Sequence, residues 1–169
     1  MKNRIVLVGY SGAGKSTIAR KIANYFSFSV LDTDMMLEEK YHISVYDTFE
    51  KYGEEVFRQL EYKILLEALQ QKNVVIATGG GAPCFFDAMK RINETALSIY
   101  IEMDPKSLAQ RLRYAKVTRP LTINKTAEEL LSFVTEQLEV RSSIYKQAKL
   151  TVKGEDLDFG ELIRLLINY

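Results

Sequence analysis

A glycine-rich segment near the start of the chain has the residue pattern with the clearest chemical meaning. Residues 9–16 read GYSGAGKS and match G-x-x-x-x-G-K-[ST] between an apolar run and a helical pattern. In such a loop, backbone N–H groups and a helix N-terminus surround phosphates. Lys15 then reaches the β- and γ-phosphates, and Ser16 ligates magnesium. The sequence therefore predicts a site for a nucleoside triphosphate with magnesium. Its residues are Gly12, Ala13, Gly14, Lys15, Ser16 and Thr17.

Two carboxylates follow the next apolar run, at Asp32 and Asp34. If this segment is extended, residues i and i+2 point to the same side, toward the phosphates. One carboxylate would organise a magnesium-bound water, and the other would accept a proton from an attacking hydroxyl. The alternative is that Asp32 or Thr33 only caps the following helix. Capping would not explain both acids.

Two arginines occupy positions where an anion is needed. The segment 127–147 has an apolar stripe at Leu130, Val134, Leu138 and Tyr145. Arg141 falls within this stripe, so its guanidinium needs a carboxylate partner, from either the protein or a ligand. Arg58 lies at the edge of another stripe, where Glu54 and Glu61 could instead form surface salt bridges with it.

A run of three glycines, Gly79, Gly80 and Gly81, directly follows another apolar run. Successive glycines are typical where the backbone comes close to a bulky group or adopts positive φ, and a small substrate is the expected neighbour. Residues 115–126 have basic residues and little periodicity, which indicates a lid or a plain surface connection. In this segment Arg119 stands beside the rigid Pro120. Such a position would suit an arginine that swings onto the transferring phosphoryl oxygens when the site closes.

The spacing of apolar residues predicts strands that alternate with helices. The expected strands are 5–8, 29–31, 74–77, 97–101 and 150–152, and the expected helices are about 16–25, 34–41, 45–52, 54–71, 84–93, 105–114, 127–147 and 158–168. Such alternation indicates an α/β fold with a parallel sheet covered on both sides, and ligands at the carboxyl ends of the strands. The polar and glycine-rich segments all follow strands, so they should gather at one edge of the sheet.

Composition narrows the class of protein. With 169 residues and 47% hydrophobic content, the chain should form a single domain, 1–169. A formal net charge of +1 gives no general attraction to nucleic acid or an anionic membrane. No segment approaches the roughly 18 apolar residues of a membrane span. One cysteine excludes an internal disulfide and suits a reducing compartment, so we expect a cytoplasmic protein.

Taken together, these motifs resemble the shikimate kinase family across nearly the whole chain. The matching segments are Gly9–Thr17, Asp32-Thr33-Asp34, Phe49 to Glu61, Gly79 to Ala82, Arg119-Pro120-Leu121 and Arg141 to Tyr145. The resemblance implies a three-layer P-loop kinase fold, with a five-stranded parallel sheet in the order 2-3-1-4-5. It also implies substrate-binding helices at about 33–61 and a lid at about 115–126. The implied reaction is ATP plus shikimate giving ADP plus shikimate 3-phosphate. We expect the protein to be a monomer.

The resemblance assigns the nucleotide-side roles by position. Lys15 and Ser16 handle phosphates and magnesium, Asp32 holds the metal through water, and Arg119 is the lid arginine. Arg113 would contact adenine. The segment between Arg113 and Arg119 is short and lacks the glycines that family members often have there. Residues 153–156 have no arginine for the adenine loop, so backbone contacts are expected to recognise the base.

The resemblance also assigns the acceptor side. Asp34 would engage the substrate hydroxyls and act as the base, while Arg58 and Arg141 would hold the shikimate carboxylate. The remaining substrate-binding residues would be Phe49, Phe57, Gly79, Gly80 and Gly81. Two alternatives stay open: a gluconate-type kinase, and a nucleotide-binding module without catalysis.

Overall fold

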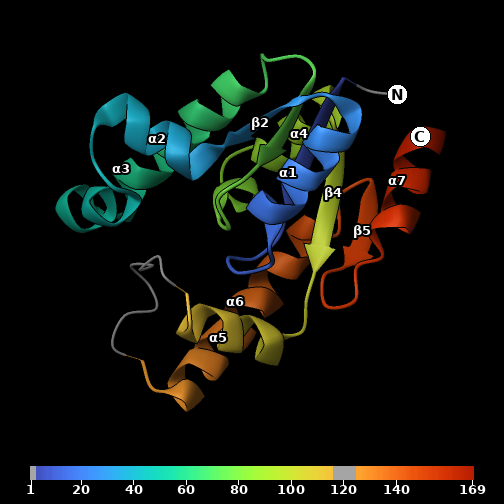
Figure 1. Cartoon of the computed structure of the whole chain (residues 1–169). Helices are drawn as coiled ribbons and strands as arrows, with labels where there is room; N and C mark the ends of the chain where they lie inside the picture. Colours follow the sequence, from blue (N-terminus) through green and yellow to red (C-terminus); the bar gives the residue numbers. More distant parts are fainter. Residues whose placement is uncertain (1–2, 116–124) are drawn as a thin grey trace.

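The computed structural model describes residues 3–115 and 125–169, and its elements alternate as the sequence predicts (Figure 1). The elements are β1 (Arg4–Val8), α1 (Lys15–Phe26), β2 (Ser29–Asp32), α2 (Thr33–Tyr41), α3 (Val45–Ala68), β3 (Val74–Ala77), the 3₁₀ turn η1 (Ala82–Cys84), α4 (Ala88–Thr95), β4 (Leu97–Glu102), α5 (Pro105–Arg113), α6 (Ala127–Tyr145), β5 (Leu150–Lys153) and α7 (Phe159–Asn168). Most of the predicted lid, with Arg119, lies outside the described residues.

The strands form one parallel sheet in the order β2-β3-β1-β4-β5, which confirms the predicted fold. The central strands are buried on both faces, with Ile5, Val6, Leu7 and Val8 of β1 fully inaccessible. This explains why they read as continuous apolar runs. The edge strand β5 instead alternates between half-buried and exposed residues.

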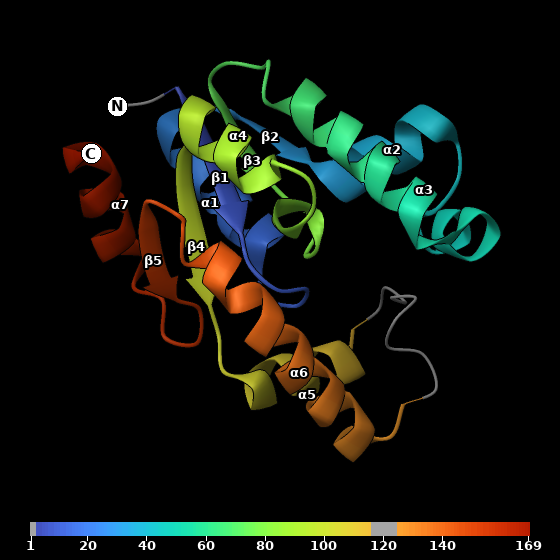
Figure 2. The same cartoon turned by 180° about the vertical axis from the view of Figure 1, so that it is seen from behind.

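Helices cover both faces of the sheet (Figures 1 and 2). α1 packs over β1, β2 and β3, while α4 packs against β4. Figure 2, seen from behind, shows α4 in front of the sheet and α1 behind it, while most of α6 lies below the sheet. α2 and α3 extend to one side as a pair, and α5 packs along α6 beyond the end of β4. In the described residues no helix is long and apolar enough to cross a membrane.

Two helix boundaries differ from the prediction, and each difference has a local cause. The predicted helices 45–52 and 54–71 form one element, α3, which is kinked where Gly53 has φ 79° and ψ 171°. The helix predicted at 84–93 begins only at Ala88. Phe86 adopts φ 55° in the left-handed region, which interrupts a helix that would otherwise continue from η1.

Hydrogen bonds tie three strand ends together at the carboxyl edge of the sheet. The Thr78 hydroxyl donates to the carbonyl oxygen of Leu7 at 3.0 Å, which joins the ends of β3 and β1. The Gly79 N–H donates to the hydroxyl oxygen of Thr33 at 2.9 Å, which joins the ends of β3 and β2. The phosphate loop, the carboxylate segment and the triple glycine therefore meet at this edge.

Candidate active site

The phosphate loop has the backbone geometry that its glycines allow. Gly9, Gly12 and Gly14 have φ of 138°, 86° and 88°, values that other residues rarely adopt. α1 begins at Lys15, so its N-terminus faces the loop. The Lys15 ammonium group donates to the carbonyl oxygens of Gly9 and Tyr10, at 2.7 and 2.8 Å. The loop is thus shaped around a buried cation.

The carboxylate of Asp32 both caps a helix and meets the phosphate loop. One of its oxygens accepts from the Asp34 N–H at 3.1 Å, and the other accepts from the Ser16 hydroxyl at 2.6 Å. The capping interpretation is therefore confirmed, and the same carboxylate also contacts the phosphate loop, while its role at a metal site stays a prediction. The extended geometry expected for Asp34 is wrong, because α2 begins at Thr33 and Asp34 lies in its first turn.

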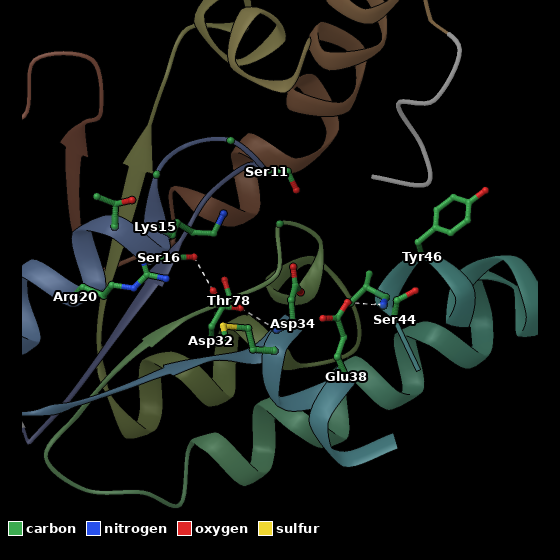
Figure 3. A pocket seen from close by; sticks show the side chains of 16 residues that line it. Ser11, Lys15, Ser16, Arg20, Asp32, Asp34, Glu38, Ser44, Tyr46 and Thr78 are labelled. Atoms are coloured by element: carbon green, nitrogen blue, oxygen red, sulfur yellow. Dashed lines mark hydrogen bonds between the residues drawn. The ribbon is translucent and has the colours of Figure 1, made fainter. Parts of the chain in front are cut away.

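Asp34 nevertheless shares a cavity with Ser16 and Asp32, as Figure 3 shows. This nucleotide-side cavity has a volume of about 610 Å³. It is lined by Ser11, Gly12, Gly14, Lys15, Ser16, Thr17, Arg20, Asp32, Asp34, Met35, Glu38, Ser44, Val45, Tyr46, Thr78 and Gly80. Ala13 belongs to the phosphate loop, but it is buried and does not line this cavity.

A second cavity, the acceptor-side cavity, adjoins the first. It is lined by Tyr10, Ser11, Asp34, Val45, Phe49, Phe57, Arg58, Glu61, Gly80, Gly81, Leu112, Phe133 and Arg141. Ser11, Asp34, Val45 and Gly80 line both cavities. The predicted substrate residues Phe49 and Phe57 lie edge to face, with ring centroids 5.7 Å apart. The predicted nucleotide residues and the predicted substrate residues thus line two adjoining cavities, and Asp34 lines both.

Arg58 is buried, and both of its predicted partners are present. Its guanidinium donates to Glu61 at 2.7 Å and to Glu54 at 3.1 Å. The expectation of a surface pair is wrong for Glu61, since Arg58 is 6% and Glu61 4% exposed. The ring of Phe85 packs against the guanidinium, with its centroid 4.3 Å from the central carbon. These contacts fix Arg58 beside the acceptor-side cavity.

Arg141 is half-buried and has no carboxylate within ion-pair distance in the described parts of the chain. Its guanidinium lies 5.7 Å from the centre of the Tyr10 ring and lines the acceptor-side cavity. The sequence left open whether the carboxylate partner of Arg141 belongs to the protein or to a ligand, and the described residues supply none from the protein. The position therefore suits a carboxylate on a ligand.

The triple glycine is required by close approach and not by positive φ, since the glycines with positive φ in the described residues are Gly9, Gly12, Gly14 and Gly53. A Cβ atom at Gly79 would lie 2.6 Å or less from carboxylate oxygens of Glu61 and Asp34. At Gly80 it would lie 2.6 Å from the Ser11 hydroxyl, and at Gly81 it would lie 2.5 Å from a nitrogen of Arg58. The bulky neighbours are thus the chain's own site residues, not only a substrate as expected.

Two residues of the triple glycine also line the acceptor-side cavity. Gly80 and Gly81 are buried and line the acceptor-side cavity. Among the described residues, no acceptor lies within hydrogen-bond distance of either N–H group. Buried backbone donors are nearly always paired. Together with Arg58 and Arg141, these N–H groups form a site suited to an anion.

Glu61 is a site residue that the sequence interpretation considered only as a partner of Arg58. Burial raises the pKa of its carboxyl from 4.5 to about 7, against the opposing effect of Arg58. Asp34 contributes a smaller rise in this pKa, and Arg141 a smaller decrease. The signal in the sequence was the i, i+3 spacing, but burial could not be read from it because Glu61 could equally lie on the outer face of the helix.

Of the two arginines at the end of α5, Arg111 and not Arg113 approaches the phosphate loop. A nitrogen of Arg111 lies 3.5 Å from the carbonyl oxygen of Gly12 and 3.6 Å from the position of a Cβ on Gly14. Arg113 is exposed and lines a separate hollow between α5 and α6, with Ala127 and Leu130. The structure therefore does not bring Arg113 to the nucleotide-side cavity.

Comparisons with known proteins agree with this geometry. The family model described as shikimate kinase matches residues 11–167. A shikimate kinase of Phocaeicola vulgatus is 42% identical over 92% of this chain and 89% of its own length. The crystal structure of shikimate kinase from Bacteroides thetaiotaomicron superposes with a TM-score of 0.92 at 36% identity, covering 100% of both chains. Shikimate kinase from Acinetobacter baumannii, in complex with shikimate, gives 0.87 at 28% identity, covering 99% of this chain and 94% of its own.

The raised pKa of Glu61 predicts a specific dependence of stability on pH. Between about pH 4.5 and 7 the folded protein retains a proton on Glu61 that the unfolded chain releases. Stability from this group is therefore fully present below pH 4.5 and is lost as pH rises through 7, by an amount on the order of 3 kcal/mol. Glu61→Gln should remove this decline, as measured by urea unfolding at a series of pH values.

Glu54→Gln is the matched control, because Glu54 also pairs with Arg58 but is exposed. This variant should keep the wild-type pH dependence. An unchanged decline in Glu61→Gln would show that another group titrates in this range.

Proposed function

The chain belongs to the shikimate kinase family, and from this premise we propose that it transfers the terminal phosphoryl group of ATP to the 3-hydroxyl of shikimate. The observation that carries the proposal is the placement of Asp34, which lines both the phosphate-loop cavity and the guanidinium-lined cavity. A hydroxyl beside Asp34 would face the phosphate loop. Neither a gluconate-type kinase nor a noncatalytic nucleotide-binding module is favoured by any contact in the site.

The nucleotide side fits ATP with magnesium. Lys15 and the α1 N-terminus supply positive charge to the β- and γ-phosphates. The Ser16 hydroxyl and the Asp32 carboxylate, 2.6 Å apart, form a pair of hard oxygen donors of the kind Mg²⁺ prefers. Among the described residues, no group of three or more acidic, histidine or cysteine side chains is placed to hold a metal ion, so phosphates and water would complete the coordination. When bound, magnesium neutralises charge on the phosphates.

On the acceptor side, Asp34 is the proposed base. As the acceptor oxygen forms its bond to the γ-phosphorus, the Asp34 carboxylate accepts the hydroxyl proton, and the bond between the γ-phosphorus and the bridging oxygen of ADP breaks. The neighbouring Glu61 carboxyl approaches Asp34 across Gly79.

The acceptor carboxylate is proposed to bind between Arg58 and Arg141. Both guanidinium groups line the acceptor-side cavity, and the N–H groups of Gly80 and Gly81 add uncharged donors there. Phe49 and Phe57 supply an apolar wall for the ring of the acceptor. Gly79 has no side chain, and this leaves room for the carboxylates of Asp34 and Glu61.

Three parts of the proposal rest on the sequence. Arg119, which lies outside the described residues, is proposed to reach the transferring phosphoryl group from the lid formed by residues 115–126. The formal charge of +1 supports an enzyme without nucleic-acid or membrane partners. We also propose that the chain acts in the cytoplasm as a single-domain monomer, 1–169.

An assay of ADP release with different acceptors tests the function directly. With ATP and Mg²⁺, the protein should turn over shikimate, whereas gluconate and AMP should give only the background rate. Lys15→Ala should abolish turnover on shikimate, because phosphoryl transfer depends on charge neutralisation at the phosphates. Preferred turnover of gluconate or AMP would refute the assignment, as would ATP binding without turnover of any acceptor.

Removal of either clamp arginine should weaken acceptor binding. Arg141→Ala should raise the shikimate KM by about 10- to 100-fold, since a charge-assisted pair is lost, while the ATP KM changes little. Arg58→Ala should also raise the shikimate KM, but it should destabilise the fold as well, because it leaves buried Glu61 without this partner. Lys146→Ala, which removes an exposed cation at the C-terminal end of α6, is the control. An unchanged shikimate KM in Arg141→Ala would contradict the clamp.

A matched pair of variants tests which arginine serves the nucleotide. Arg111→Ala should raise the ATP KM several-fold, because it removes a guanidinium beside Gly12 and Gly14. Arg113→Ala, two residues away on the same helix, should leave the ATP KM near the wild-type value. The reverse order of effects would restore the nucleotide role that the sequence predicted for Arg113.

A further inference from the structure

A buried hydrogen bond joins α6 to the triple glycine. The Tyr145 hydroxyl donates to the carbonyl oxygen of Gly80 at 2.6 Å, across 65 residues of sequence. Tyr145 is fully buried, and its ring centre lies 5.3 Å from that of Tyr100. Burial raises the pKa of Tyr145 well above its ordinary value, so the hydroxyl stays protonated and can donate. Cys84 and Arg141 also lie near this hydroxyl, and Arg141 opposes the rise in its pKa.

The geometry of the peptide bond gives this contact a directional effect. The Gly80 carbonyl and the Gly81 N–H belong to one planar peptide unit, which is trans because the described residues have no cis peptide. In a trans unit the C=O and the N–H point in opposite directions. A bond that fixes the Gly80 oxygen on the α6 side therefore directs the Gly81 N–H away from α6.

The peptide between two glycines needs such a contact. Without Cβ atoms, Gly80 and Gly81 have few steric barriers to rotation of this unit. The Gly81 N–H is buried, lines the acceptor-side cavity, and has no acceptor within hydrogen-bond distance among the described residues. A hydrogen bond to the carbonyl also polarises the peptide and strengthens its N–H as a donor.

We propose that Tyr145 is a positioning residue: it holds the Gly80–Gly81 peptide in the orientation that presents the Gly81 N–H to the carboxylate of the acceptor. This proposal rests on the proposed function. Arg141, one turn earlier on α6, lines the same cavity. One helix thus supplies a guanidinium directly and a backbone donor indirectly to the same carboxylate.

Tyr145→Phe tests the proposal by removing one oxygen atom and leaving the ring stacked on Tyr100. The shikimate KM should rise by about 10-fold, as expected for the loss of a hydrogen bond to a charged group. The kcat and the ATP KM should stay within about twofold of the wild-type values. Tyr100→Phe is the matched control, since its hydroxyl makes no hydrogen bond to the triple glycine. An unchanged shikimate KM, or a fall in kcat alone, would overturn the proposal.

A second acceptor separates positioning from a general structural effect. The carboxamide analogue of shikimate keeps a carbonyl acceptor but lacks the anion, so Tyr145→Phe should raise its KM by a smaller factor than it raises the shikimate KM. An equal rise in KM for both acceptors would refute the proposed action through the carboxylate. Because both acceptors are measured on the same folded variant, a loss of stability alone cannot produce the difference.

The wild-type protein provides a test that needs no variant. In an amide NMR spectrum, the Gly81 signal should move downfield on addition of shikimate and much less on addition of the carboxamide. A Gly81 signal that shikimate leaves in place would overturn the proposal. Failure of the proposed function is a distinct outcome, because the wild-type protein would then show no turnover of shikimate.

Discussion

The site depends on a stretch of backbone without side chains, Gly79 to Gly81, which lets charged groups from separate elements approach within contact distance. Carboxylates from α2 and α3, a hydroxyl from the phosphate loop and the Arg58 guanidinium all lie where a Cβ atom would clash. Close packing leaves no room for even one methyl group there. The sheet holds this segment in place through hydrogen bonds from Thr78 and Gly79. The two cavities can therefore share one wall.

Charge balance is the second constraint on this region. Arg58 and Glu61 compensate each other in a buried pair, and Arg58 has a further, more exposed partner in Glu54. Arg141 has no carboxylate within ion-pair distance among the described residues, and it lines the cavity together with Asp34. A guanidinium without an ion pair in a partly buried cavity favours an anionic ligand. The same region thus combines structural ion pairing with a capacity for binding a carboxylate.

Several residues combine a structural role with a proposed chemical role. Asp32 caps α2 and also reaches Ser16, so the start of a helix and the proposed metal site depend on one carboxylate. Tyr145 fills the core and also bonds to the Gly80 carbonyl. For such residues a structural role and a chemical role do not exclude each other. Asp32 can serve in both roles, because its two carboxylate oxygens have different partners.

The sequence by itself determined the order of elements, the parallel sheet and the phosphate loop, because apolar periodicity and glycine spacing are local properties of the chain. It also identified Asp34, Arg58 and Arg141 as residues that need a particular environment. Only the tertiary structure decided that Glu61 is buried, that Arg111 rather than Arg113 lies at the loop, and that Gly80 meets Tyr145. These facts depend on which helix face turns inward and on contacts between distant segments, and neither is encoded in local spacing.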